Sequence, residues 1–348
     1  MLNNGRVYAG TVRAGPKTLL DYLVDEFAHS SRDEWQQRCG KGLITLQGRT
    51  ATPKDMVTNG DRVEYRREPW VEPIVPTQLP IIFDERGMIA VHKPSGLPVM
   101  PSELYYENTA LQLLKRHHVQ GGEPPIPIHR LGVGTSGVLL CGTSVEARRA
   151  LTAALKQGKV LKTYRALVDG LVTEDMFEIN VPIGPVPHAS FGGAVAGAVP
   201  DGVGAKSALS HVKVLHRDEA RCTSVVRVII RTGRPHQIRI HLAYVGHPLT
   251  GDPLYVSGGR PLDLLELNEE GGRPALPRDV GYFLHAEMVA FQPGVFIFSP
   301  PPRELCTLGD LPYASGSVPS PLARAEMASD LAALTPDFAS LLHLFPRG

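Results

Sequence analysis

The start of the chain has apolar residues at helical spacing, followed by short alternating runs. Residues 18–29 place leucine, valine and phenylalanine on one face, which predicts an amphipathic helix. A second helix is expected to run from near Ser31 to Gly40. Ser30 or Ser31 can cap this helix, and Glu34 lies within capping-box reach. Short strands should follow at 43–46 and 62–65, so residues 1–70 are predicted to form a small αβ module.

Prolines then cluster at positions 69, 73, 76 and 80. Proline removes a backbone donor and disfavours helix in the residue before it, so the segment 71–80 is expected to be a linker. The rest of the chain is predicted to divide into a main domain, 81–310, and a C-terminal tail, 311–348. A short apolar helix is expected within that tail at 325–334.

The main domain mixes strand-like and helix-like patterns. Amphipathic helices are expected at 110–118 and 145–157. Strands are expected at 88–92, 136–142, 163–168, 208–215, 224–231 and 289–298. The small and nearly uncharged run 192–204 is interpreted as a mobile loop. Strands grouped in hairpins with scattered helices predict an α+β domain whose sheet is mixed or largely antiparallel.

Length and composition are typical of a folded protein of two domains, or of one large domain with a smaller module. The 348 residues are 43% hydrophobic, which is enough for a substantial core. No apolar run approaches the roughly 18 residues that span a bilayer, and the N-terminus lacks the apolar region of a secretory signal. The four cysteines lie far apart without a CxxC pair, which argues against structural zinc. We therefore expect a cytoplasmic protein, with an organelle as the open alternative.

The net charge is only +1, but it is unevenly distributed. Residues 112–165 carry nine Lys or Arg against two acidic residues, whereas residues 260–348 carry six against eleven. Concentrated positive charge would suit a polyanionic ligand. The alternative is a solvated helix face.

The stretch from His129 to Gly137 (HRLGVGTSG) is interpreted as a loop that enters a strand, because an apolar run follows directly. Together with 233–241 (GRPHQIRIH), it resembles the signature of the RluA-type pseudouridine synthases, enzymes that isomerise uridine within RNA. The resemblance extends from about Ile81 to Arg303 and implies the α+β fold of that family. Its further blocks lie at 93–97, 162–168, 246–255 and 284–286.

The N-terminal module is similar to the S4 RNA-binding domain. Its order of two helices and short strands fits, with basic Arg38 and Lys41 at the end of the second helix and a Gly-Asp turn at 60–61. The alternative is a generic αβ cap.

The family resemblance implies roles for several side chains. Tyr164 would stack on or near the target base, and Arg239 would pair with the catalytic aspartate. Arg130 would act as the wedge or backbone contact that holds a flipped nucleotide. Further RNA contacts are expected from His129, Arg234, His236 and Lys93.

Structural alternatives exist for three of these residues. Tyr164 lies in an apolar strand, where a core tyrosine is the usual finding. Arg239 alternates with Ile238 and Ile240 and would ordinarily lie on the solvent side of a strand. Lys93 is either an RNA contact or an exposed loop charge.

Gly132 stands where the family has its catalytic aspartate. A glycine offers no carboxylate to attack the ribose or to remove a proton from it. Arg239 also loses its expected partner, and a buried unpaired guanidinium is costly. Three replacements are open: Asp252, which sits in a matched block, an RNA phosphate, or solvent.

Histidines 236, 241 and 247 raise the question of a metal site. A spacing of five on a strand points the first two to opposite faces, and no carboxylate or cysteine completes a ligand set. We therefore expect neither a metal nor another cofactor.

Two functions remain in view. The first is an RNA pseudouridine synthase that flips a uridine out of a structured rRNA or tRNA and uses a relocated carboxylate or an altered mechanism. The second is a catalytically silent RNA-binding protein on the same fold, because position 132 is Gly132. A hydrolase or metal enzyme that uses the histidines is a weaker third. No protein partner is indicated.

Overall fold

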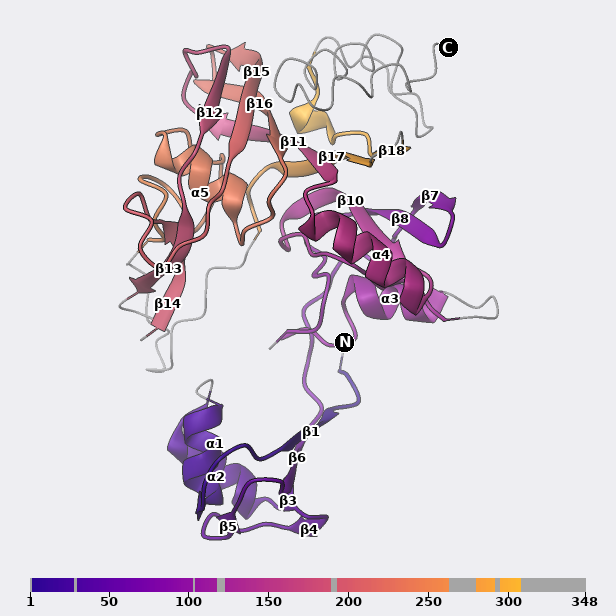
Figure 1. Cartoon of the computed structure of the whole chain (residues 1–348), viewed down its shortest axis with the longest axis vertical. Coiled ribbons are helices and arrows are strands. Elements are labelled where there is room, and N and C mark those ends of the chain that lie inside the picture. The colour runs from indigo at the N-terminus through magenta and orange to yellow at the C-terminus, as the bar shows by residue number, and fades with distance from the viewer. Residues whose placement is uncertain are drawn as a thin grey trace. The chain divides into compact units, whose positions relative to one another are not determined.

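The computed structural model describes residues 2–27, 30–102, 104–117, 123–188, 193–262, 280–291 and 295–307. The chain divides into two compact units, Met1–Ile74 and Val75–Gly348 (Figure 1). The expected tail at 311–348, with its helix at 325–334, lies outside the described residues.

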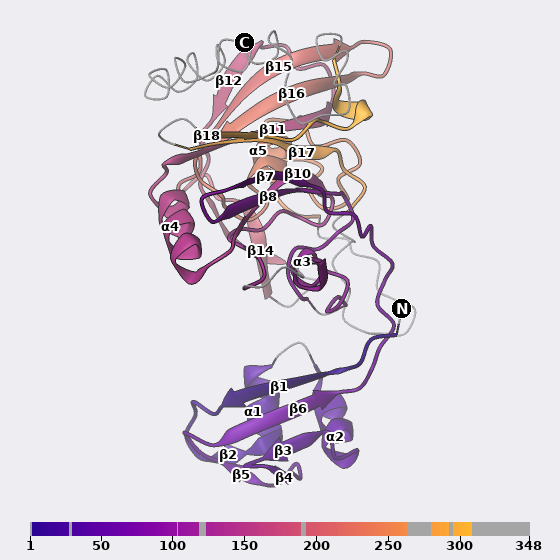
Figure 2. The same ribbon diagram turned by 90° about the vertical axis from the view of Figure 1, so that its right-hand side faces the viewer.

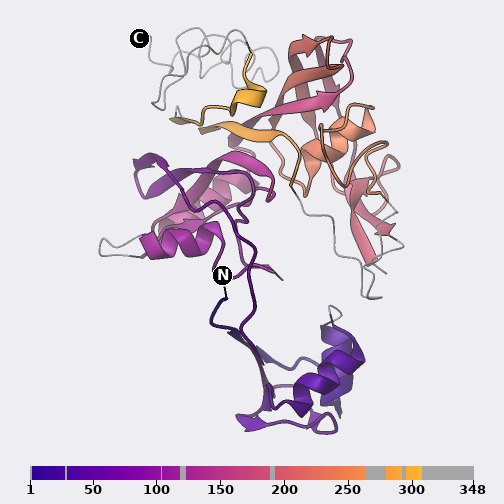
Figure 3. The same ribbon diagram turned by 180° about the vertical axis from the view of Figure 1, so that it is seen from behind.

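The N-terminal unit is a four-stranded antiparallel sheet with two helices packed against it (Figures 2 and 3). The helices are α1, Leu19–Glu26, and α2, Arg32–Gly40, close to the predicted bounds. Ser31 and Glu34 form the expected capping box, with the Ser31 hydroxyl accepting from the Glu34 amide. The sheet order is β1-β6-β3-β4, and a separate β2-β5 ribbon lies beside it. The strands are β1 Arg6–Thr11, β2 Lys17–Thr18, β3 Ile44–Leu46, β4 Arg49–Thr50, β5 Met56–Val57 and β6 Arg62–Arg67.

The larger unit is built on a ten-stranded sheet whose main path runs β12-β15-β16-β11-β17-β10-β8-β7. β18 pairs with β17, and β9 pairs with β10. The β10–β17 pair is parallel and the other described pairs of this sheet are antiparallel, so the predicted mixed α+β fold is confirmed. The strands are β7 Ile81–Glu85, β8 Met88–Lys93, β9 Ile126–Pro127, β10 Thr135–Gly142, β11 Val160–Asp169, β12 Met176–Ile179, β15 Ser210–Asp218, β16 Thr223–Ile230, β17 Leu284–Phe291 and β18 Val295–Phe298.

Helices cover both faces of this sheet. α3, Ala110–His117, and α5, Gln237–Tyr244, contribute to the large core on one face. α4, Val145–Lys156, packs against a smaller core on the other face, formed mainly by β8, β10 and β17. A short 3-10 turn, η2, spans Arg303–Leu305. No helix among the described residues is both long enough and apolar enough to cross a membrane.

Two local predictions were wrong. The run 192–204, expected to be a mobile loop, contains strand β14, Gly193–Ala198, which pairs with β13, Ile183–His188, as a ribbon beside α5 (Figure 1). Small side chains allow this ribbon to lie against its neighbours. A Cβ on Gly197, for example, would lie 2.7 Å from a Val186 methyl carbon. The segment around Arg239, analysed as a strand, is helix α5, in which residues 237–243 are buried. A helix that is buried on every side lacks the polar face that makes helical periodicity visible.

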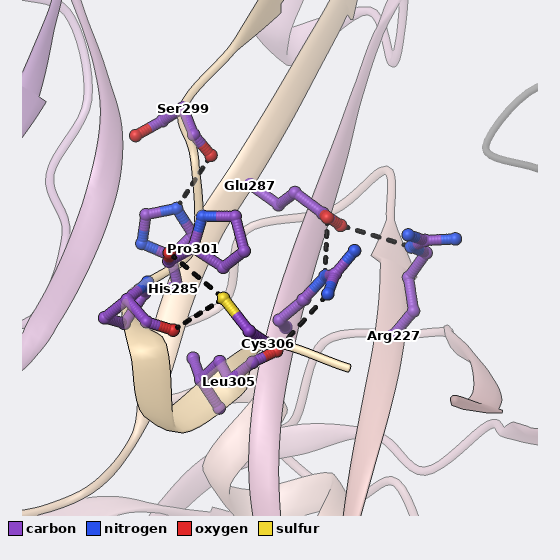
Figure 4. A network of polar contacts seen from close by, with 9 residues as sticks. Arg227, His285, Glu287, Ser299, Pro301, Leu305 and Cys306 are labelled. Atoms are coloured by element: carbon purple, nitrogen blue, oxygen red, sulfur yellow. Dashed lines mark hydrogen bonds and ion pairs between the residues drawn. The ribbon is translucent and has the colours of Figure 1, made fainter. Parts of the chain in front are cut away.

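A buried ion-pair network crosses three strands of the large sheet (Figure 4). Arg165 Nε donates to Glu287 Oε1 at 2.6 Å, and Arg227 Nε donates to Glu287 Oε2 at 3.1 Å. Arg165 Nη1 also donates to the Leu305 carbonyl at 3.3 Å. Burial alone would raise the pKa of Glu287, but the two guanidinium groups outweigh it and lower that pKa. The carboxylate is therefore ionised and binds β11, β16 and β17 together.

Candidate active site

A cavity of about 580 Å³ opens between the loop before β10, the start of β11 and the start of α5. These elements are far apart in sequence, but the sheet order and the packing of α5 bring them together. Lys93 and Asp252 are not among its lining residues, and Arg38 and Lys41 belong to the N-terminal unit. Seven residues singled out from the sequence line it: His129, Arg130, Gly132, Tyr164, Arg234, His236 and Arg239.

The loop that carries Gly132 is held from behind by the block 93–97. Lys93, on β8, is fully buried, and its ammonium donates to the carbonyls of Pro94, Leu97 and Val133 at 2.9, 2.7 and 3.2 Å. The Ser95 hydroxyl donates to the Gly134 carbonyl at 2.8 Å. Neither expectation for Lys93, an RNA contact or an exposed loop charge, is correct. Three convergent carbonyls hold this buried cation, which thereby joins the loop at 94–97 to the loop that contains Val133.

Tyr164 belongs both to the cavity wall and to the core. It lies on β11, paired with Val228 of β16 and Ala286 of β17, and the residue is 8% exposed. Burial raises the pKa of the Tyr164 phenol well above its ordinary value, so the hydroxyl is neutral. The buried face packs in the large hydrophobic cluster, while another part of the residue lines the cavity.

Arg239 is anchored by Asp252 in a two-point ion pair. Its Nε donates to Asp252 Oδ2 at 2.7 Å, and its Nη2 donates to Oδ1 at 2.8 Å. The guanidinium carbon also lies 4.4 Å from the ring centroid of Tyr282 and 5.2 Å from that of Tyr255. Asp252 Oδ1 accepts further bonds from the amides of Leu254 and Tyr255 at 2.8 and 3.1 Å. Both carboxylate oxygens are thus engaged within the protein, and Arg239 presents a fixed positive group to the cavity.

The two histidines that line the cavity are held by internal hydrogen bonds. His129 Nε2 accepts from the Leu140 amide at 3.0 Å. Burial, together with the nearby charge of Lys162, lowers the pKa of His129 to about 4, so its imidazole is neutral. His236 has a left-handed backbone, with φ 54°, at the start of α5, and its Nδ1 lies 3.0 Å from the Tyr255 hydroxyl. These contacts shape the cavity wall.

The cavity is cationic. No aspartate or glutamate lines it among the residues that the structure describes. Burial, followed by repulsion from Arg234, lowers the pKa of Lys162 to about 8. Arg130 is exposed where it lines the cavity, so it is accessible to a ligand. The basic lining residues are Arg130, Lys156, Lys162, Arg231, Arg234 and Arg239.

Arg38 and Lys41 differ in their surroundings within the N-terminal unit. Arg38 donates to the Ser30 hydroxyl at 2.7 Å and lies over the rings of Trp35 and Tyr65. Lys41 is exposed and makes a surface ion pair with Glu68 at 3.1 Å. Arg38 therefore helps to pack α2, whereas the Lys41 ammonium is accessible.

Four basic or aromatic residues of the cavity were not singled out from the sequence: Lys156, Lys162, Arg231 and Tyr282. Lys162 stands in the same block as Tyr164, so its motif membership was an available signal. No sequence signal pointed to Tyr282, because it lies two residues before the block at 284–286. Its contact with the Arg239 guanidinium is evident only in the structure.

The chain is similar to known proteins. Residues 87–244 match the family model described as RNA pseudouridylate synthase. RNA pseudouridine synthase 5 of Arabidopsis thaliana is 38% identical, and the match covers 83% of this chain and 89% of that protein. An uncharacterized RNA pseudouridine synthase of Synechocystis sp. is also 38% identical, over 83% of this chain and 96% of the relative. The solved structure of human RNA Pseudouridylate Synthase Domain Containing 4 aligns with a TM-score of 0.49 at 22% identity, covering 65% of this chain and 89% of that one. By its sequence relatives, the chain belongs to the RluA-type RNA pseudouridine synthase family.

Proposed function

We propose that this chain converts uridine to pseudouridine in a structured RNA, and that the reaction takes place in the cationic cavity. The observation that carries the proposal is the convergence of Arg130, Tyr164 and Arg239 on one cavity together with Gly132. A base inside a duplex cannot reach such a site, so we expect the target nucleotide to be flipped out of its stack. The neutral ring of Tyr164 would then offer a platform for the base.

The reaction must proceed without a carboxylate at position 132, because this residue is Gly132. The isomerisation breaks the N1–C1′ bond, forms the C5–C1′ bond, removes the proton from C5 and adds one at N1. We assign Asp252 to positioning and not to reaction, because both its oxygens are bonded and it does not line the cavity. The fixed charge of Arg239 would stabilise negative charge that develops on the uracil as the glycosidic bond breaks.

The N-terminal unit is proposed to be an S4-like RNA-binding module that adds affinity. The support is its helix pair and the accessible ammonium of Lys41 at the C-terminal end of α2. In this assignment Arg38 acts indirectly, because it packs on Trp35 and holds the helix that Lys41 follows.

A cytoplasmic location is proposed as well. The support is that Cys39 and Cys141 are buried free thiols, a state that a reducing compartment preserves. Fractionation of cells that express the tagged chain would test this, and recovery in an organelle fraction would contradict it.

The modifying activity can be tested by mapping. Purified protein is incubated with cellular rRNA and tRNA, and pseudouridine is located by carbodiimide-dependent stops in primer extension. We expect new stops at discrete uridines. Arg130→Gln should weaken modification by roughly tenfold, the size of one charged contact. Arg149→Gln, which alters an exposed α4 residue that does not line the cavity, is the matched control and should leave modification unchanged.

The silent RNA-binding alternative has one supporting observation, the lack of a carboxylate among the described cavity residues. Gly132→Asp separates the two functions. Stops made only by Gly132→Asp, with RNA binding intact in the parent, would replace the proposed function by the alternative.

A further inference from the structure

Lys162 is a buried cation without an anionic partner among the residues that the structure describes. The residue is 9% exposed, and the one hydrogen bond that its ammonium makes among the described residues runs to the Thr232 carbonyl at 3.1 Å. An ammonium has three donors, so two remain for a ligand. No acidic side chain among the described residues lines the cavity to neutralise it.

The protein is shaped to keep this amine at the cavity wall. A Cβ on Gly233 would lie 3.0 Å from Lys162 Nζ, so the glycine leaves the space in which the ammonium lies. The neighbouring Arg234 donates from Nε to the Ser207 carbonyl at 3.0 Å, which fixes the direction of its guanidinium. Both side chains line the same cavity.

Each of the two cations is thus held by a backbone carbonyl, that of Thr232 or of Ser207, in the wall of the same cavity. Their repulsion contributes to the lowered pKa of Lys162, about 8, after the larger effect of burial. Burial and then the charge of Lys162 lower the pKa of His129, so this histidine is neutral and offers no compensating charge. An anion between the two cations would remove the repulsion and supply the missing acceptors.

We propose that Lys162 and Arg234 form a phosphate subsite in the wall of the cavity, which takes a phosphodiester group next to the target uridine. Lysine supplies a point charge and arginine a planar donor pair, which together suit a tetrahedral oxyanion. The anion site is inferred from the buried Lys162 ammonium and from Arg234 in the same cavity wall. Its assignment to an RNA phosphate rests on the proposed function.

The first experiment measures RNA affinity against salt. The logarithm of Kd for a substrate RNA is plotted against the logarithm of KCl concentration for the parent, Lys162→Gln, Arg234→Gln and Lys159→Gln. Removing one phosphate contact should weaken binding roughly tenfold and lower the slope by about 0.7 to 0.9. Lys159 is exposed and does not line the cavity, so its variant should match the parent.

A folded Lys162→Gln protein with the affinity and slope of the parent would overturn the subsite. Folding is checked by circular dichroism and by the thermal midpoint. Should Lys162→Gln fail to fold, Arg234→Gln carries the same test from the more exposed side of the pair.

The second experiment needs no variant. The Lys162 amine is followed by NMR of the intact protein during a pH titration in chloride and in inorganic phosphate at equal ionic strength. Phosphate should raise the measured pKa, and uridine 5′-monophosphate should do so where uridine does not. An unchanged pKa in both phosphate solutions would overturn the subsite.

The two proposals fail separately. Phosphate binding at Lys162 in a protein that modifies no RNA would contradict the proposed function and support the anion site. If the parent modifies RNA and its Lys162→Gln variant binds RNA like the parent, the proposed function is supported and the anion site is contradicted.

Discussion

Gly132 and Arg239 together define the chemical question at the scale of single residues. A family aspartate at position 132 would serve both as a reacting group and as a partner of the arginine. In this chain the second role falls to Asp252, which binds Arg239 through both oxygens. The guanidinium therefore stays fixed without a carboxylate at position 132, which leaves the cavity net positive.

Asp252→Asn should be costly, because it removes the charge that compensates a buried guanidinium. We expect the free energy of unfolding to fall by about 3 kcal/mol, together with loss of modifying activity. Urea denaturation of the full chain measures the first and carbodiimide mapping the second. Asp201→Asn is the control, since Asp201 is exposed and accepts only a turn amide among the described residues. Equal stability of the two variants would mean that the ion pair contributes nothing.

The sequence indicated which residues gather at the site better than it indicated what each one does. Ordered motif blocks pointed to the cavity residues and put Asp252 forward as a partner for Arg239. The burial of Lys93 could not be predicted from the sequence. Its ammonium donates to the carbonyls of residues 94, 97 and 133, and these come together only when the two loops meet in the fold.

The predictions at the scale of elements succeeded where a capping signal or a strand-like run of apolar residues was clear. Helix α2, with its capping box, and strands β8, β10 and β16 lie close to their expected bounds. α5 was missed because residues 237–243 are all buried, so no polar face marks the helix. β14 was missed because its glycines and alanines carry little strand preference. In both cases tertiary packing determines the structure.

Ser31→Ala tests the capping box of α2. Loss of the hydroxyl leaves the Glu34 amide without its acceptor, which should cost about 1 kcal/mol of local stability. Hydrogen exchange of the α2 amides in the full chain should quicken accordingly. Ser31→Thr retains a capping hydroxyl and should exchange nearly as slowly as the parent. Identical exchange in the alanine variant would show that this cap is dispensable.

Glu287→Gln tests the ion-pair network that joins β11, β16 and β17. Two buried guanidinium groups would lose their shared anion, so we expect a loss of about 3 to 5 kcal/mol in the free energy of unfolding at neutral pH. Glu85→Gln, at the exposed end of β7, is the control and should change stability little.

The same network predicts the direction of a pH dependence. Because folding lowers the pKa of Glu287, its contribution is present above the ordinary glutamate pKa of about 4.3 and is lost as the pH falls through the folded value. The difference in stability between the parent and Glu287→Gln should therefore shrink on acidification below that range. A difference that grows on acidification would contradict the assignment.

At the scale of the whole molecule, one compact unit contains the cationic cavity and the other contains the basic end of α2. RNA binding should consequently weaken steeply with salt, because several phosphates would be neutralised at once. Lys41→Gln should lower affinity to a similar degree for all RNA sequences, as expected for a backbone contact, without altering which uridine is modified. Filter binding across a salt series, followed by mapping, would show this, and a shifted modification site would speak against it.

Release of tritium from RNA labelled at uridine C5 tests the central claim most directly, since forming the C5–C1′ bond must expel that hydrogen. The parent protein, with Gly132 in place, should release tritium to water in proportion to the pseudouridine formed, whereas a mixture without protein should release none. If stoichiometric protein binds the RNA and still releases no tritium from any cellular RNA, the cavity does not catalyse isomerisation.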